Sequence, residues 1–202
     1  MRRLFVAALL AVCLTLLFFG SVEAGQDSWY SYCGLGLAFN SYSGELEKIH
    51  ESATFRGRDD EVPLGFDAGV YWPLSERSRT LVGFVFNGGE DHSDNGVDHL
   101  EIEFSNFGVS SMHFFGLDRC AGLFVRADLG MAWYKLEASG TEVFSDASNR
   151  GFSELGYGGL IGGGYGFHVS RGKAILLNVN YAIRRAGADQ LSTFGMTIGL
   201  LI

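Results

Sequence analysis

Hydrophobic and polar residues alternate with a period of two along most of the chain. In the stretch ELGYGGLIGGGYGFHV, residues 154–169, five glycines occupy even positions from 156 to 166, and large apolar residues occupy odd positions. Successive side chains of a β-strand point to opposite faces, so this pattern predicts a strand with one bulky face and one nearly bare face. The glycine spacing does not fit a dinucleotide-binding loop, which needs glycines at the first, third and sixth places before a helix.

The same alternation recurs in seven further segments. They cover residues 29–41, 64–72, 80–87, 100–115, 123–134, 175–184 and 193–202. In the segment from residue 100, we assign Leu100, Ile102 and Phe104 to the apolar face and Glu101 and Glu103 to the polar face. The rhythm changes after this point, which predicts a β-bulge near residues 105–106.

The connections between these segments alternate in length. Tight turns are expected at 75–78, 116–119 and 170–173, and longer polar loops at 42–62, 90–99, 139–150 and 186–191. Glycines and charges share one face of the segments, and large apolar residues take the other. Long strands, short turns at one end and long loops at the other are typical of outer-membrane barrels. The sequence therefore predicts an all-β fold, an eight-stranded antiparallel transmembrane β-barrel whose narrow interior the glycines leave room to fill.

The first 24 residues have the features of a cleaved secretory signal peptide. Arg2 and Arg3 precede a long apolar run, and small residues follow at the cleavage-type positions. We therefore expect a signal peptide at 1–24 and one barrel domain at 25–202. The whole chain has a formal net charge of −8, and segment 1–24 holds two Arg and one Glu, which leaves −9. Such an acidic chain lacks the basic footprint of a nucleic-acid-binding protein.

At this point the sequence resembles the small eight-stranded outer-membrane proteins of Gram-negative bacteria, of the OmpA-transmembrane-domain, OmpX and opacity-protein type. The last strand resembles the C-terminal assembly signal of that family through Thr193, Gly195, Ile198 and Leu200, although Leu201-Ile202 replaces the usual terminal aromatic residue. The resemblance implies location in the cell outer membrane and insertion by the outer-membrane assembly machinery. It also implies contact with outer-membrane lipid and lipopolysaccharide, and a monomer.

Seven charged residues fall on the face that should line the lumen. Two interpretations stay open for them: a polar conduit or gate, and a salt-bridged plug in a closed barrel, which we favour because buried charges must pair. The residues are Asp67, Glu101, Glu103, Arg126, Asp128, Glu154 and Arg184.

Residues 90–99 are a weak candidate for metal binding. Asp91, Ser93 and Asn95 echo the start of a calcium loop, but the twelfth position holds Ile102 where a bidentate Glu is needed. We expect a solvated acidic turn, no confident metal site and no cofactor. Ser111 and His113 share a strand face, as an esterase pair would, but they are expected toward the periplasmic rim. We therefore expect no enzymatic activity.

Cys33 and Cys120 are expected to remain thiols. They fall on strands across the ring, about 16 Å apart, whereas a disulfide needs Cα atoms within about 7 Å. The aromatic residues, with Phe104 and Phe114 among them, are expected to form girdles at the two membrane interfaces.

The expected function is that of an integral outer-membrane barrel with a mostly closed, charge-paired lumen, serving envelope integrity or surface interaction through its extracellular loops. A narrow channel or an OmpW-like transporter for small solutes is the alternative. A lipid A-modifying enzyme is a more distant one.

Overall fold

The computed structural model describes residues 29–50, 64–94, 99–116, 120–139, 150–170 and 172–202. These residues form a closed barrel in which the eight strands follow chain order and every neighbouring pair is antiparallel. The strands are β1 (Tyr30–Ser43), β2 (Leu64–Pro73), β3 (Thr80–Asp94), β4 (His99–Phe114), β5 (Gly122–Ser139), β6 (Arg150–Ser170), β7 (Lys173–Ala186) and β8 (Asp189–Leu201). The predicted fold class is confirmed, whereas the predicted signal peptide lies outside the described residues.

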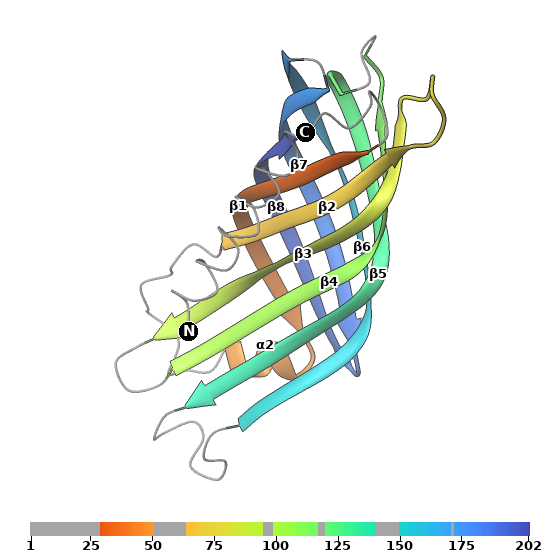
Figure 1. The fold of residues 1–202 in the computed structure, drawn as a ribbon. Coiled ribbons are helices and arrows are strands. Elements are labelled where there is room, and N and C mark those ends of the chain that lie inside the picture. The colour runs from red at the N-terminus through yellow and green to blue at the C-terminus, as the bar shows by residue number, and fades with distance from the viewer. Residues whose placement is uncertain (1–28, 51–63, 95–98, 117–119, 140–149, 171) are drawn as a thin grey trace.

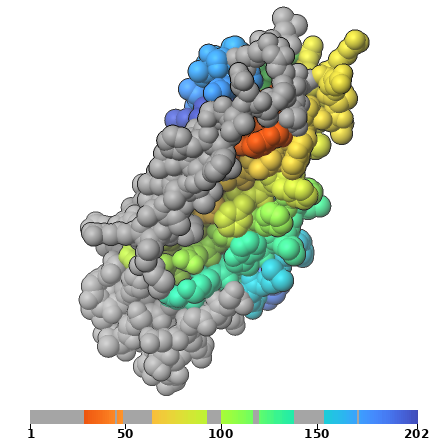
Figure 2. Space-filling model, viewed as in Figure 1, coloured from red at the N-terminus to blue at the C-terminus, as the bar shows by residue number. Residues whose placement is uncertain are grey.

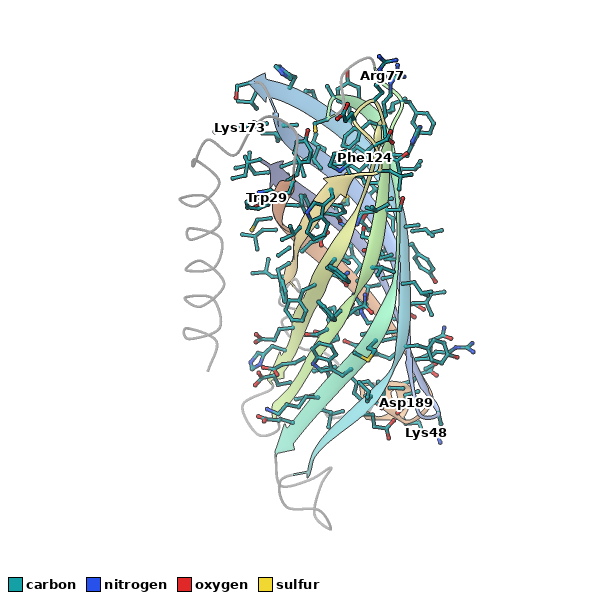
Figure 3. All side chains as sticks on the ribbon, turned by 45° about the vertical axis from the view of Figure 1, so that its right-hand side comes forward. Trp29, Lys48, Arg77, Phe124, Lys173 and Asp189 are labelled. Atoms are coloured by element: carbon teal, nitrogen blue, oxygen red, sulfur yellow. The ribbon has the colours of Figure 1, made fainter. Side chains whose placement is uncertain are left out.

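The barrel has two different ends (Figure 1). One, here called the turn end, holds the connections after β2, β4 and β6, the start of β1 and the end of β8. Figure 3 shows Arg77 and Lys173 at this end. The opposite loop end carries Lys48 and Asp189, and the short helix α2 (Glu45–His50) follows β1 there. Among the described residues, no helix has the length and apolar character needed to span a bilayer.

The wall is uneven in length. Strands β4, β5 and β6 have 16, 18 and 21 residues, whereas β2 has 10 and β8 has 13. Figure 2 shows the longer strands, coloured yellow-green to cyan, as a continuous side wall. The barrel therefore projects further on the side of β3 to β6 than on the side of β1 and β8.

Side chains alternate between the two faces in all eight strands, and the predicted faces are confirmed in seven of them. In β7, Ile175, Leu177 and Val179 are 40–49% exposed on the outside, and Ala174 and Leu176 are buried inside. In β6, the even glycines face the lumen, and added Cβ atoms at Gly156 and Gly164 would lie 1.7 and 1.8 Å from carbonyl oxygens of β7. Glycine therefore lets these two strands approach closely, besides leaving room in the lumen.

Strand β4 differs from the prediction in two respects, its regularity and the face that carries its first apolar residues. Its pairing with β3 and β5 is continuous from residue 99 to residue 114, so the bulge predicted near 105–106 is absent. Even-numbered side chains point inward along its whole described length, so Leu100, Ile102 and Phe104 lie inside the barrel. The one irregularity recorded in the pairing of β6 with β7 falls between His168 and Ser170.

Two loops are shorter than predicted. Strands β7 and β8 are joined by Gly187 and Ala188 alone, in place of a loop over 186–191. Gly187 has a positive φ of 59°, which suits a two-residue hairpin connection. Strand β3 extends to Asp94 and β4 begins at His99, so most of the predicted loop 90–99 is regular sheet.

Candidate functional site: the lumen

The lumen contains three layers along its length. An apolar cluster fills the turn end, here called the turn plug, and a second fills the loop end, here called the loop plug. The turn plug consists of Tyr30, Tyr32, Tyr71, Leu81, Met112, Phe114, Cys120, Phe124, Ala174, Leu176 and Leu201. The loop plug consists of Ala38, Tyr42, Leu46, Leu100, Ile102, Phe104, Tyr134, Leu136, Ala186 and Leu191. Buried polar and charged residues lie between the two plugs.

Arg126 is the centre of the polar layer. Its guanidinium bridges the lumen from β5 to Asp67 on β2 and also binds Asp128 two residues along its own strand. The Nε–H of Arg126 donates to Asp128 Oδ1 at 2.9 Å, and Nη2 donates to Asp67 Oδ1 at 3.0 Å. All three side chains are buried, so each carboxylate depends on this one cation.

Hydroxyl groups extend this network to the wall. Ser110 donates to Asp128 at 2.5 Å, and Ser110 and Tyr71 are hydrogen-bonded at 2.9 Å. Asn178 donates to Tyr32 at 2.7 Å, and the Arg126 guanidinium lies 5.5 Å from the centre of the Tyr32 ring. The turn plug therefore supports the central ion pair through its tyrosines, in a cation–π contact and hydrogen bonds.

Arg184 is the second buried cation. Its guanidinium donates to the Asn87 side-chain oxygen at 2.9 Å and to the Thr193 hydroxyl at 3.0 Å. The guanidinium carbon also lies 4.9 Å from the centre of the Phe104 ring in the loop plug. No carboxylate within the described ranges forms an ion pair with it. The two buried arginines equal Asp67 and Asp128 in number, and Asp189 is a further buried carboxylate at the loop end.

The remaining predicted lumen charges divide into two groups. Glu154 does face the lumen, where Tyr134 donates to it at 3.3 Å and to Asp189 at 2.9 Å. The prediction for Glu101 and Glu103 is wrong, because β4 turns these side chains outward. Glu103 pairs in register with Lys135, and Glu101 with Glu137. Lys135 forms an ion pair with Glu137 on the outer face, and this hydrogen bond raises the pKa of Lys135.

Two aromatic residues of the plugs lie on the face opposite to the one predicted for them. Phe104 and Phe114 were assigned to interfacial girdles, but both are fully buried inside the barrel. The signal was the unbroken parity of β4, which places both residues on the same face as Asn106 and Ser110. Other aromatic residues do lie outside, where the rings of Phe66, Phe86 and Trp133 pack in a row with centroid separations of 5.3 and 5.8 Å.

The other candidate sites do not come together as binding centres. Asp91 lies in β3 and accepts a hydrogen bond from Tyr42 at 2.6 Å, Ser93 lies in the same strand, and Asn95 is outside the described residues. Among the residues described, no three His, Cys, Asp or Glu side chains are placed to hold a metal ion. His113 is hydrogen-bonded to Thr80 at 2.9 Å.

The cysteine prediction is confirmed for one residue and wrong for the other. Cys120 is buried in the turn plug and keeps its thiol. Cys33 is disulfide-bonded, and its partner lies outside the described residues. Cys33 and Cys120 are not joined to each other, as the predicted separation of their strands requires.

Within the last strand, the four assembly-signal residues divide between the faces. Thr193 is buried and donates to Asn40 at 2.9 Å, and Gly195 also faces the lumen. Ile198 is 64% exposed on the outer face, which it shares with Leu200. β8 closes the barrel against β1 over twelve residue pairs from Tyr32 to Ser43. The assembly role of these residues stays a prediction.

Comparison with known proteins agrees with this architecture. No protein-family model matches the chain, and no curated protein matches it either. Among solved structures, Ail, the attachment invasion locus protein of Yersinia pestis, has a TM-score of 0.58 at 11% identity, over 87% of this chain and 99% of Ail. Ail has also been crystallised with the heparin analogue sucrose octasulfate. Neisserial surface protein A has a TM-score of 0.55 at 10% identity, over 89% of this chain and 99% of its own.

These likenesses and the barrel's own surface define the class of protein. The outer face of the middle of the barrel consists of exposed apolar side chains on all eight strands, such as Leu35, Val109, Leu129, Ile161 and Ile198. A surface of this kind is stable in contact with lipid. The chain is a small eight-stranded transmembrane β-barrel of the outer-membrane type.

Proposed function

We propose that this protein is a non-conducting barrel of the Gram-negative outer membrane that acts through its loop end at the cell surface. The observation that supports a non-conducting barrel is the presence of an apolar plug at each end of the lumen. Water and ions would have to cross both plugs and the Arg126 ion pairs between them. The turn end then faces the periplasm and the loop end faces outward, as in barrels of this type.

The projecting side wall supports a role in surface interaction over one in envelope integrity alone. Beyond the aromatic row Phe66–Phe86–Trp133, the outer face of β3 to β5 becomes charged, with Glu90, Glu103 and Lys135 in one register row. A wall that continues past the apolar region in hydrogen-bonded strands fixes the positions of the strand ends Asp94, His99 and Ser139, from which the connections start. This wall carries more acidic than basic residues, and acidic residues repel a polyanion. We therefore do not propose that this protein binds a ligand such as the sucrose octasulfate found with Ail.

Conductance of the refolded full chain in a planar bilayer tests the closed lumen. We expect no steps in the wild type and none in Phe114→Ala or Phe104→Ala, because each variant weakens one plug and leaves the other in place. The double variant should leak. Discrete steps in the wild type would instead favour a narrow channel or transporter, the second candidate.

A cellular assay tests the surface role. Residues 140–149, between β5 and β6, are replaced by a Gly-Ser linker of equal length, and the cells are scored for adherence and for uptake of a small dye. We expect reduced adherence with unchanged uptake. Raised uptake with unchanged adherence would support a function in envelope integrity and contradict the surface role. No enzymatic role is proposed for Ser111 and His113.

A further inference from the structure

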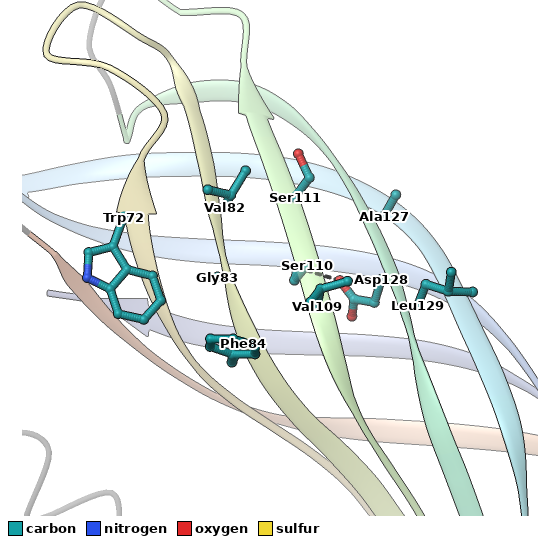
Figure 4. A pocket seen from close by; sticks show the side chains of 10 residues that line it. All are labelled: Trp72, Val82, Gly83, Phe84, Val109, Ser110, Ser111, Ala127, Asp128 and Leu129. Atoms are coloured by element: carbon teal, nitrogen blue, oxygen red, sulfur yellow. Dashed lines mark hydrogen bonds between the residues drawn. The ribbon is translucent and has the colours of Figure 1, made fainter.

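The lipid-facing surface contains a trough on one side of the barrel (Figure 4). It crosses β2 to β5 in the half nearer the turn end and has a volume of about 480 Å³. Trp72, Phe84, Val109 and Leu129 form its raised edges, and Ser111 and Ala127 lie in its floor.

The trough follows from the sizes of side chains in adjacent register rows. Phe84, Val109 and Leu129 lie opposite one another on β3, β4 and β5, and each is more than half exposed. The next row toward the turn end, two residues along each strand, is Val82, Ser111 and Ala127. Because the side chains of this second row are smaller, the outer surface is recessed there by about the length of a side chain. The residues around this recess are apolar, and in a bilayer they would contact lipid hydrocarbon.

The end of the trough nearer the turns is polar. In the row after Ser111, Thr80 and His113 are hydrogen-bonded at 2.9 Å, and the His113 ring packs edge-on against Phe115 at 4.9 Å. The adjoining β2–β3 turn exposes Arg77 and Arg79, together with Glu76. The apolar trough is thus bordered at its turn end by the imidazole of His113 and by the β2–β3 turn, which has a net positive charge.

We propose that this trough binds an anionic glycerophospholipid of the periplasmic leaflet. One acyl chain lies along Trp72, Phe84 and Leu129, and the phosphate lies beside His113 and the β2–β3 turn. The depth supports this assignment, because the trough ends at the turn end, where headgroups of that leaflet lie. The charge supports it as well, since a basic residue near an anionic headgroup increases affinity by about fivefold.

Fluorescence of Trp72 tests this proposal. In the full chain with Trp29→Phe and Trp133→Phe, Trp72 is the remaining tryptophan, and vesicles contain lipids with brominated acyl chains, which quench a tryptophan in contact. At equal mole fraction, brominated phosphatidylglycerol should quench Trp72 at least threefold more effectively than brominated phosphatidylcholine. The combined change His113→Ala, Arg77→Ser and Arg79→Ser should bring the ratio to one. Arg185→Ser, at the loop end, is the matched control and should leave the ratio unchanged.

A second variant tests the apolar part. Ala127→Leu fills the floor and should lower the quenching by both lipids. Equal quenching by the two lipids without any substitution would overturn the proposal, and this comparison does not depend on a variant that folds. Quenching of Trp72 could instead fall as the protein-to-lipid ratio rises, with dimers captured by cross-linking. That result would show that a second copy of the chain covers the trough, and it would also overturn the proposal. Neither result bears on conductance, so failure here leaves the closed lumen unaffected.

Discussion

The middle of strand β4 and its loop-end part place apolar side chains on opposite faces. In the middle, Phe107 and Val109 are 45% and 55% exposed on the outside, while Ser110 is buried inside. Toward the loop end, Ile102 and Phe104 are buried inside, while Glu101 and Glu103 face outward. The strand itself runs without a break. The surroundings, lipid or water, therefore decide which face of a continuous strand is apolar.

The same inversion continues on β5. Arg126 and Asp128 point inward in the membrane half, where Leu129 points outward. Leu136 points inward in the outer half, where Lys135 and Glu137 form their ion pair outside. Beyond the apolar turn plug, the barrel therefore combines a membrane section, apolar outside and polar inside, with an outer section built like a water-soluble protein. Four predictions test this contrast, in order of decreasing effect.

The largest effect is expected from Arg126→Met. It leaves Asp67 and Asp128 buried without their cation, and breaking a buried ion pair in this way costs about 3–5 kcal/mol. Urea unfolding of the barrel in phospholipid vesicles measures the loss. The variant that also carries Asp67→Asn and Asp128→Asn should recover most of it, because no unpaired carboxylate remains. If Arg126→Met alone is neutral, the polar layer does not hold the membrane section together.

A truncation in the outer section should be nearly as costly. Ile102→Ala removes a fully buried side chain from the loop plug, for which core truncations cost about 2–5 kcal/mol. Val109→Ala, seven residues along the same strand, removes two methyl groups that face lipid and leaves no internal cavity, so it should cost about 1.5 kcal/mol. Unfolding of both variants under the same conditions gives the comparison. Equal losses would show that the two halves do not differ in this way.

A charge on the outer face separates the halves again. Val109→Lys places a cation against lipid, which costs about 2–4 kcal/mol near the bilayer midplane. Glu103→Lys changes the charge where the outer face is already polar, and we expect a change below about 1 kcal/mol. The heat-dependent shift in gel mobility confirms folding of each variant before its unfolding is measured. A tolerated lysine at 109 would place that residue outside the bilayer.

The smallest effect is expected from the exposed ion pair. Lys135→Ala removes the partner of Glu137, and both side chains are about 40% exposed. Exposed pairs contribute about 0–1 kcal/mol and are screened by salt. The difference from wild type should shrink further between low and high ionic strength. A loss that is large and independent of salt would indicate that this face is buried against another molecule.

Much of the fold could be predicted from the sequence because period two survives in every strand. In β7, alternation alone separates Ile175, Leu177 and Val179 from Ala174 and Leu176. It also placed Asp67, Arg126 and Asp128 in the lumen. Alternation does not say which face is which, and that choice rested on the rule that apolar residues face lipid. This rule fails where a strand extends beyond the membrane, so Glu101 and Glu103 were assigned to the wrong face. The apolar residues of β4 change faces after Phe104, and a bulge was predicted there to explain this change.

The pairings inside the lumen could not be predicted in the same way. That Arg126 reaches across to Asp67, whereas Arg184 binds Asn87 and Thr193, depends on strand register and on tilt around the ring. Neither is encoded in local periodicity. The loop plug was missed for a related reason, because Leu46 comes from the short helix α2 and only the closed barrel brings it to Ile102 and Leu191 in one cluster.

With the loop end outward, as proposed, the projecting wall has a consequence for anything that approaches the cell from outside. Strand β5 continues six residues past Trp133, which at about 3.3 Å per residue and a tilt near 40° raises its end by roughly 15 Å. Of the described strands, an antibody or phage tail would meet a high end at β5 and a low one at the β7–β8 hairpin, where Gly187 and Ala188 make the connection. Such a ligand would reach the end of β5 while it is still too far from the membrane to touch the β7–β8 side. It would therefore bind in one preferred orientation.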